Sequence, residues 1–200
     1  MAIHKGPKSM LKESLKEMLV VAEYCINFRK DISWGEKQIN GCLGYPAAMM
    51  LFSIADTIGS FFRGNEKFKI RIEKSEKFIK NTGHNHLYIL NSDFYDQQHL
   101  TEGFIKDLYD SYRSSLTHNA ILLPNRYLNI GEDKEHVFEL KGNIPFVHLR
   151  PFLNISKIAV NKFLNDIDNN IDDSEQLRIL SLKKDFSNKE VLKVLGFINK

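Results

Sequence analysis

Cysteine is scarce in this 200-residue sequence, which contains only Cys25 and Cys42. Two thiols cannot build a disulfide scaffold or a four-thiolate zinc site, so we interpret both as reduced side chains that pack as small hydrophobic groups. Proline (5 residues) and glycine (11 residues) are also few, while 42% of the residues are hydrophobic. This composition excludes collagenous, low-complexity and wholly disordered chains, and it predicts a single domain over residues 1–200.

Long apolar runs are missing as well. The apolar stretch from Gly41 to Ala55 ends at Asp56 and is shorter than the ~18 residues that a transmembrane helix needs. The N-terminal segment carries charges where a signal peptide would have its apolar core. We therefore expect a cytoplasmic protein that makes no membrane contact.

Several signatures of enzyme chemistry do not occur. The sequence has no GxGxxG or GxxxxGK[ST] loop for phosphates and no GxSxG elbow for a nucleophilic serine. The nearest approach to a metal cluster is formed by His84, His86, Asp93 and His99, whose spacing matches no zinc motif. We expect neither a metal nor another cofactor.

Charge of one sign is only slightly in excess, with a formal net charge of +3. Residues 1–80 contain 14 Lys and Arg against 9 Asp and Glu, whereas residues 81–200 contain 14 against 16. Seven of the basic residues lie between Arg63 and Lys80. We interpret this stretch as solvated surface, with contact to a polyanion as the alternative.

The hydrophobic periodicity predicts a mainly α-helical protein. Apolar residues recur at helical spacing over residues 9–31, 46–63, 101–122 and 152–167. The second of these stretches is apolar around most of its circumference, apart from a narrow polar stripe that includes Asp56, so we expect it in the middle of a helical bundle.

The rest of the chain predicts additions to this bundle. Residues 67–72 alternate with a period of two and predict a short extended segment, and residues 86–95 predict a short helix. Residues 126–149 predict a small β-hairpin insertion around a Lys-Gly-Asn turn at 141–143. We therefore expect a helical core at about 9–163 and a C-terminal helical extension at about 174–200, after an acidic linker.

The predicted helix at 101–122 carries the candidate chemistry. Its sequence YRSSLTHN places His118 five positions after Arg113. Such a pair is expected about 0.7 times by chance in a chain of this composition, so the spacing alone decides little. On an ideal helix the two side chains diverge by about 140° and flank the apolar stripe, and Asn119 falls within the stripe. Polar groups on a buried seam need partners or a function; the alternative is that His118 and Asn119 simply cap the helix end before Pro124.

At these residues the sequence resembles the HEPN superfamily, which is marked by Arg, four to six residues, and then His. The run YRSSLTHNAIL and the earlier helix LFSIADTIGSFFRG carry the resemblance, which covers residues 9 to about 163. HEPN domains are helical bundles that usually form dimers, and many are metal-independent endoribonucleases of toxin, abortive-infection and other defence systems. The resemblance therefore implies a homodimer, an RNA substrate and an antitoxin or defence partner protein.

The resemblance also implies roles for individual residues. Imidazole titrates near neutral pH, so His118 would move a proton during RNA cleavage, and Arg113 would hold the phosphate as a permanent cation. Because the two side chains diverge on one helix, a symmetric dimer would bring two copies of each into one cleft. Asp56 would orient Arg113 or hold His118 in one tautomer, with a capping or lysine-paired carboxylate as the alternative. Tyr112 is interpreted as a core aromatic, with base stacking as the alternative.

One position departs from the family pattern. The residue after the arginine is often Asn, His or Asp in HEPN domains, and here it is Ser114. A serine hydroxyl retains a hydrogen-bond donor, so it can still assist the site. HEPN domains with eroded motifs act as binding or scaffold modules. The alternative function is therefore a non-catalytic, HEPN-like interaction or RNA-binding module.

Overall fold

The structure, a computed structural model, describes residues 7–80 and 83–169. The predicted helices at 175–185 and 188–197 lie outside the described residues. Of the predicted acidic linker at 165–175, residues 165–169 are described and continue the last helix.

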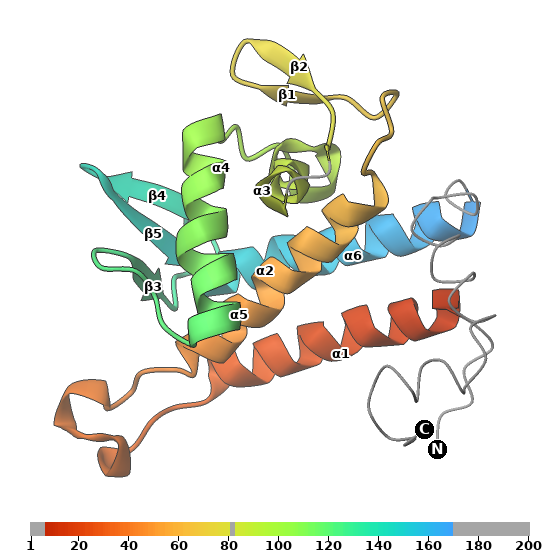
Figure 1. Cartoon of the computed structure of the whole chain (residues 1–200). Coiled ribbons are helices and arrows are strands. Elements are labelled where there is room, and N and C mark those ends of the chain that lie inside the picture. Colours follow the sequence, from red (N-terminus) through yellow and green to blue (C-terminus); the bar gives the residue numbers. More distant parts are fainter. Residues whose placement is uncertain (1–6, 81–82, 170–200) are drawn as a thin grey trace, which may run out of the picture.

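Three long helices form the base of the fold: α1 (Pro7–Asn27), α2 (Gly44–Phe61) and α6 (Leu149–Asn169). Figure 1 shows α2 crossing between the other helical elements, and it packs against both α1 and α6. Apolar residues occupy nearly the whole circumference of α2, so burying it on several sides removes the most hydrophobic surface from water. The prediction that this segment lies in the middle of a helical core is confirmed.

A second group of helical turns covers α2. It consists of α3 (Gly83–His86), the 3₁₀ turns η3 (Leu87–Asn91) and η4 (Asp93–Tyr95), and a continuous helical column. The column contains α4 (Glu102–Leu108), the π-helical turn η5 (Tyr109–Ser114) and α5 (Ser115–Asn119). The hydroxyl of Thr101 caps its start by accepting a hydrogen bond from the Phe104 amide.

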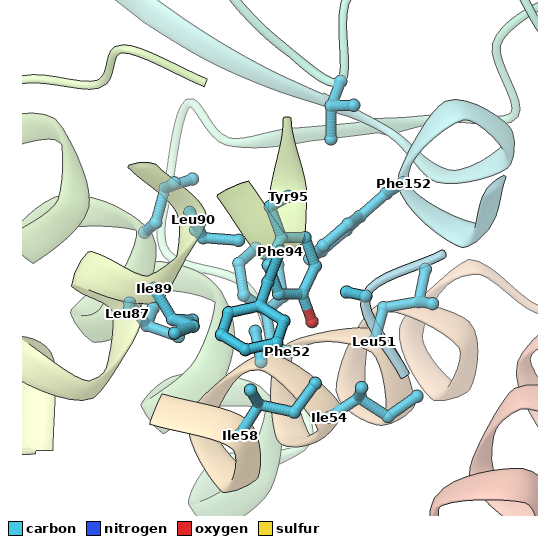
Figure 2. Packing of buried hydrophobic residues seen from close by; sticks show 14 of the residues in the cluster. Leu51, Phe52, Ile54, Ile58, Leu87, Ile89, Leu90, Phe94, Tyr95 and Phe152 are labelled. Carbon is cyan, nitrogen blue, oxygen red and sulfur yellow. The ribbon is translucent and has the colours of Figure 1, made fainter. Parts of the chain in front are cut away.

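The core lies where these two groups meet. Figure 2 shows Phe52 and Ile58 of α2 facing Leu90 of η3 and Tyr95 of η4, with Phe152 of α6 on another side. The rings of Phe52 and Phe152 pack edge to face, with centroids 5.1 Å apart. This single cluster gathers side chains from helices that are far apart in the sequence, so the helical core is shown, while its HEPN identity stays a prediction.

Two small sheets complete the described chain. Strands β1 (Ile70–Ile72) and β2 (Ser75–Lys77) form an antiparallel hairpin. In the second sheet, β5 (Ile144–His148) is central, with β4 (Phe138–Lys141) antiparallel on one side and β3 (Tyr127–Asn129) parallel on the other. Gly142 adopts φ 66° in the turn between β4 and β5, so the predicted hairpin is confirmed. The parallel pairing of β3 was not predicted.

The remaining segments connect these elements. The α1–α2 connection contains the 3₁₀ turns η1 (Ile32–Trp34) and η2 (Glu36–Gln38). Cys25 is buried and Cys42 half-buried, and both are free thiols whose pKa is raised by burial. None of the described helices combines the length and the apolar character needed to cross a bilayer.

Candidate functional site

The helical column changes its geometry at the candidate motif. Arg113 lies in η5, where a helix normally closed by i→i−4 bonds widens into a π turn. The Ser115 hydroxyl donates to the Asp110 carbonyl at 2.9 Å within this column. An α-helical angle does not apply across a π turn, so the predicted divergence of about 140° between Arg113 and His118 does not describe this structure. Single π turns inside α-helices often occur at functional sites.

Asp56 holds Arg113 from the facing helix α2. Its Oδ2 accepts a hydrogen bond from Arg113 Nη2 at 2.7 Å, and the two side chains are 16% and 23% exposed. The Arg113 guanidinium also lies over the Tyr109 ring, 5.6 Å from the centroid. The predicted contact between Asp56 and Arg113 is therefore present, and it restricts the arginine to one orientation.

The second oxygen of Asp56 contacts His86 instead of His118. Asp56 Oδ1 lies 2.9 Å from His86 Nδ1, and the His86 side chain is only 14% exposed. The same carboxylate thus joins one arginine and one imidazole, and it does not hold His118 in a tautomer. Two buried nitrogens of this cluster, His86 Nε2 and Arg113 Nε, have no hydrogen-bond partner within the described residues.

Sequence reasoning did not place His86 in this site. The missed signal is Gly59, which lies one helical turn after Asp56 in the most buried helix. A Cβ atom at residue 59 would lie 2.0 Å from the His86 carbonyl oxygen, so only glycine allows α3 to approach α2 this closely. A glycine inside an apolar helix is a recognisable sign of such an approach.

His118 lies on α5 with its side chain exposed. In the described part of the chain, it makes no hydrogen bond or ion pair. The column ends at Asn119, because Ala120 adopts the left-handed conformation with φ 56°. The prediction of a helix to Leu122 was therefore too long, and the placement of Asn119 on the buried seam was wrong: Asn119 is exposed at the helix end.

The two remaining candidate residues, Tyr112 and Ser114, have different environments. Tyr112 is fully buried, and its hydroxyl donates to the Pro145 carbonyl at 2.9 Å. It therefore serves as a core aromatic that ties the helix to the sheet, as expected, and burial raises the pKa of its hydroxyl. Ser114 is half-buried beside Arg113 in the chain, and its hydroxyl makes no hydrogen bond to the described residues.

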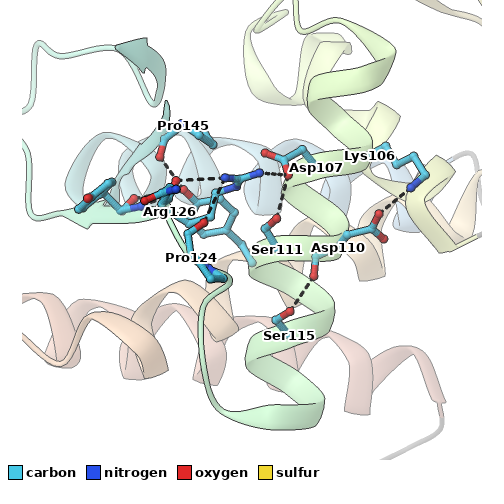
Figure 3. Close-up of polar contacts among 11 residues, drawn as sticks. Lys106, Asp107, Asp110, Ser111, Ser115, Pro124, Arg126 and Pro145 are labelled. Carbon is cyan, nitrogen blue, oxygen red and sulfur yellow. Dashed lines mark hydrogen bonds and ion pairs between the residues drawn. The ribbon is translucent and has the colours of Figure 1, made fainter. Parts of the chain in front are cut away.

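Arg126 forms a second arginine–carboxylate contact with the same column, shown in Figure 3. Its Nη2 lies 2.7 Å from Asp107 Oδ1, and the Ser111 hydroxyl donates to the same oxygen at 2.8 Å. Arg126 also donates to the carbonyls of Pro124 and Asn125. These bonds attach the column to the segment that leads into β3.

The basic stretch from Arg63 to Lys80 does not gather around His118. Its hairpin β1–β2 lies at the α4 end of the column, whereas α5 is at the other end (Figure 1). Lys77 of this hairpin forms an ion pair with Glu102 at the start of α4, and the Tyr88 hydroxyl donates to Glu102 at 2.5 Å. The His84 ring, in turn, packs edge-on against Tyr109, with centroids 6.5 Å apart.

Among residues 7–80 and 83–169, no group of three or more His, Cys, Asp or Glu side chains is arranged to hold a metal ion. His86 contacts Asp56, while His84 faces Tyr109 and Tyr88.

Comparison with protein-family models finds no match, and comparisons with curated proteins and with solved structures find no significant match. The geometry around Arg113 and His118 therefore carries the functional inference for this chain.

Proposed function

We propose that this protein is a metal-independent endoribonuclease of the HEPN type, as found in toxin and defence systems. One observation carries the proposal: Arg113 is fixed by Asp56 on the facing helix, while His118 is exposed and free of partners in the described chain. A fixed cation followed by an accessible imidazole on one helical column supplies the two groups that RNA cleavage needs.

The chemistry uses the RNA's own 2′-hydroxyl as the nucleophile. His118 accepts the proton of this hydroxyl as its oxygen attacks the neighbouring phosphorus. The bond from phosphorus to the 5′-oxygen breaks, and an imidazolium returns a proton to that leaving oxygen. Arg113 stabilises the charge that develops on the phosphate oxygens with the part of its guanidinium that Asp56 does not occupy.

A homodimer completes the site in this proposal. Two columns that face each other across a twofold axis would place Arg113 of one copy near His118 of the other. Co-expression of Arg113→Ala and His118→Ala chains tests this arrangement, since each mixed dimer would regain one intact site. Recovery of cleavage by the mixture, with neither variant active alone, supports a shared site; a mixture as inactive as its parents contradicts it.

Cleavage itself is tested with single-stranded RNA in EDTA. We expect His118→Ala to lower the cleavage rate at least ~10²-fold, because general acid–base catalysis contributes about that much. Since His118 is exposed and unpartnered, the substitution should leave the melting temperature unchanged. His136→Ala is a matched control at another exposed histidine. Equal cleavage by wild type and His118→Ala, or none by either, would contradict the catalytic assignment.

The second candidate function is a non-catalytic helical interaction or RNA-binding module. Two observations favour it: Asp56 compensates the charge of Arg113, which is only 23% exposed, and Ser114 replaces the usual residue of the family motif. This module would bind RNA or a partner protein without cutting RNA. Intact RNA in the cleavage assay, together with saturable RNA binding, would select it over the ribonuclease.

A further inference from the structure

The α1–α2 connection forms a closed loop over residues 31–40. Its ends are joined by two backbone hydrogen bonds of 2.9 Å, from the Lys30 amide to the Gly41 carbonyl and from the Asn40 amide to the Lys30 carbonyl. Every residue of the loop is exposed, including Trp34, the only tryptophan of the sequence. In Figure 1 the loop projects from the end of α1 and the start of α2. Compact surface loops with closed ends frequently carry function.

A cavity of about 970 Å³ lies between this loop and the segment around β3. This volume falls within the range of about 300–1,000 Å³ that is typical of small-molecule and cofactor sites. Its walls combine aromatic, amide and charged side chains: Lys30, Trp34, Gln38, Tyr45, Asn129 and Glu132. The cavity therefore suits a ligand with a flat apolar face, polar edges and charge.

Trp34 presents its ring beside a cation. Lys30 Nζ lies 5.0 Å from the indole centroid, and Phe28 packs edge-on with its centroid 6.2 Å away. Gln38 Oε1 accepts a hydrogen bond from Lys30 Nζ at 3.1 Å, which keeps the ammonium at the cavity wall. Even with these neighbours, 45% of Trp34 is exposed. Protein surfaces rarely leave a tryptophan this open, because its burial removes a large apolar area from water.

We propose that this cavity binds a nucleotide of single-stranded RNA, with the base stacked on Trp34 and a phosphate paired with Lys30. Stacking on an aromatic ring and pairing with a cation are the two contacts by which proteins hold unpaired RNA. The amides of Gln38 and Asn129 offer donors and acceptors to the edge of the base. The proposal rests on the proposed function, for which it supplies a substrate subsite outside the cleavage motif.

The cavity and the Arg113–Asp56 pair lie at different points along α2. Gly44, at the start of α2, lines the cavity, and Asp56 lies twelve residues later. At 1.5 Å per residue, these positions are about 18 Å apart along the helix axis. The Trp34 subsite is therefore separate from the proposed cleavage motif.

The unique tryptophan makes the test direct, because selectively excited tryptophan fluorescence reports only on Trp34. The probe is single-stranded 2′-O-methyl RNA, which lacks the nucleophilic hydroxyl and cannot be cleaved by the proposed chemistry. We expect saturable quenching of Trp34 fluorescence by this RNA and weaker quenching by AMP or UMP. If AMP or UMP quenched the fluorescence at the same concentrations as the RNA strand does, the assignment to RNA would be overturned.

Two variants separate stacking from general damage to the loop. Trp34→Ala should weaken binding of fluorescently labelled 2′-O-methyl RNA roughly 5- to 150-fold, as expected for the loss of one base stack. Ile39→Ala is the matched control, because Ile39 is an equally exposed apolar residue of the loop that does not line the cavity. Equal affinities for wild type and Trp34→Ala would overturn the proposal. So would a fluorescence shift caused by anionic lipid vesicles without any response to RNA.

The outcome is distinguishable from failure of the proposed function. Quenching by 2′-O-methyl RNA with no cleavage of ordinary RNA would sustain the subsite and reject the ribonuclease. Cleavage that depends on His118 but is insensitive to Trp34→Ala, without quenching, would reject the subsite and sustain the ribonuclease.

Discussion

The pairs Arg113–Asp56 and Arg126–Asp107 are nearly identical in geometry and differ in their neighbours. Both have a nitrogen–oxygen distance of 2.7 Å, and both arginine side chains are 23% exposed. Asp107 also accepts from Ser111, and Arg126 donates to backbone carbonyls. Asp56 instead shares its charge between an arginine and His86, beside the ring of Tyr109.

The neighbours of the two arginines indicate which one suits chemistry. Arg126 donates to Asp107 of the column and to the carbonyls of Pro124 and Asn125, so its environment explains it as a structural residue that joins the column to the segment before β3. Arg113 has one carboxylate oxygen and one aromatic face, and it is followed on the column by an exposed histidine. Distance and exposure do not separate the two pairs; the chemistry around them does.

Substituting the two arginines should affect RNA cleavage very differently. Arg113→Ala should lower RNA cleavage about 10²- to 10³-fold, because it removes the cation that stabilises charge on the phosphate. Arg126→Ala should change cleavage by less than ~3-fold after correction for the folded fraction. Cleavage rates on single-stranded RNA, with circular dichroism as the measure of folding, check both. Equal losses in the two variants would show that Arg113 acts only through stability.

In stability, the two pairs should behave alike. Asp56→Ala and Asp107→Ala should each lower the free energy of unfolding by about 1–3 kcal/mol, since each leaves a partly buried arginine without its carboxylate. Urea denaturation measures both values. A loss confined to one of the two variants would contradict their structural equivalence.

A stability effect of similar size is expected where Gly59 of α2 contacts the His86 backbone. Gly59→Ala should cost about 1–3 kcal/mol, because the new methyl group would overlap the His86 carbonyl and push α3 away from α2. Gly103→Ala in α4 is the matched control: nothing lies within 4 Å of its added Cβ, so we expect a gain of about 0.5–1 kcal/mol from helix propensity. Melting temperatures report both changes. Destabilisation by both substitutions to the same extent would contradict the close approach at Gly59.

The smallest effect is a pH dependence at the other end of the column. Hydrogen bonds from Lys77 and Tyr88 hold the pKa of the Glu102 carboxyl below its ordinary value of 4.5. A lowered pKa in the folded state stabilises the protein above pH 4.5, and this contribution is lost as the pH falls through the folded-state value. Glu102→Gln should therefore flatten the loss of stability below pH 4.5, by at most about 1 kcal/mol for an exposed pair. Denaturation at several pH values measures it, and parallel profiles for wild type and variant would contradict it.

Local features of the fold follow from sequence patterns. The apolar periodicity of α2 and the Gly142 turn are both set within a few neighbouring residues, and both predictions are confirmed. The π turn was not predictable in this way. It adds a residue to one helical turn, which shifts every later side chain around the axis.

Part of the candidate site could also be predicted from the sequence. Arg113, His118 and Asp56 stand out by type and spacing, and the contact between Asp56 and Arg113 was anticipated as one of two alternatives. His86 and the Trp34 cavity were not, because their partners lie far away in the sequence: His86 meets a carboxylate 30 positions earlier, and Trp34 faces the segment around β3.

Local propensity and hydrophobic pattern are enough to predict the long helices, the burial of α2 and the residues that could carry chemistry. The contacts of Asp56 with Arg113 and His86, the pairing of Arg126 with Asp107 and the cavity beside Trp34 become visible only in the folded chain. These contacts depend on how distant segments pack, since a carboxylate binds whichever cation or imidazole the packing brings within about 3 Å.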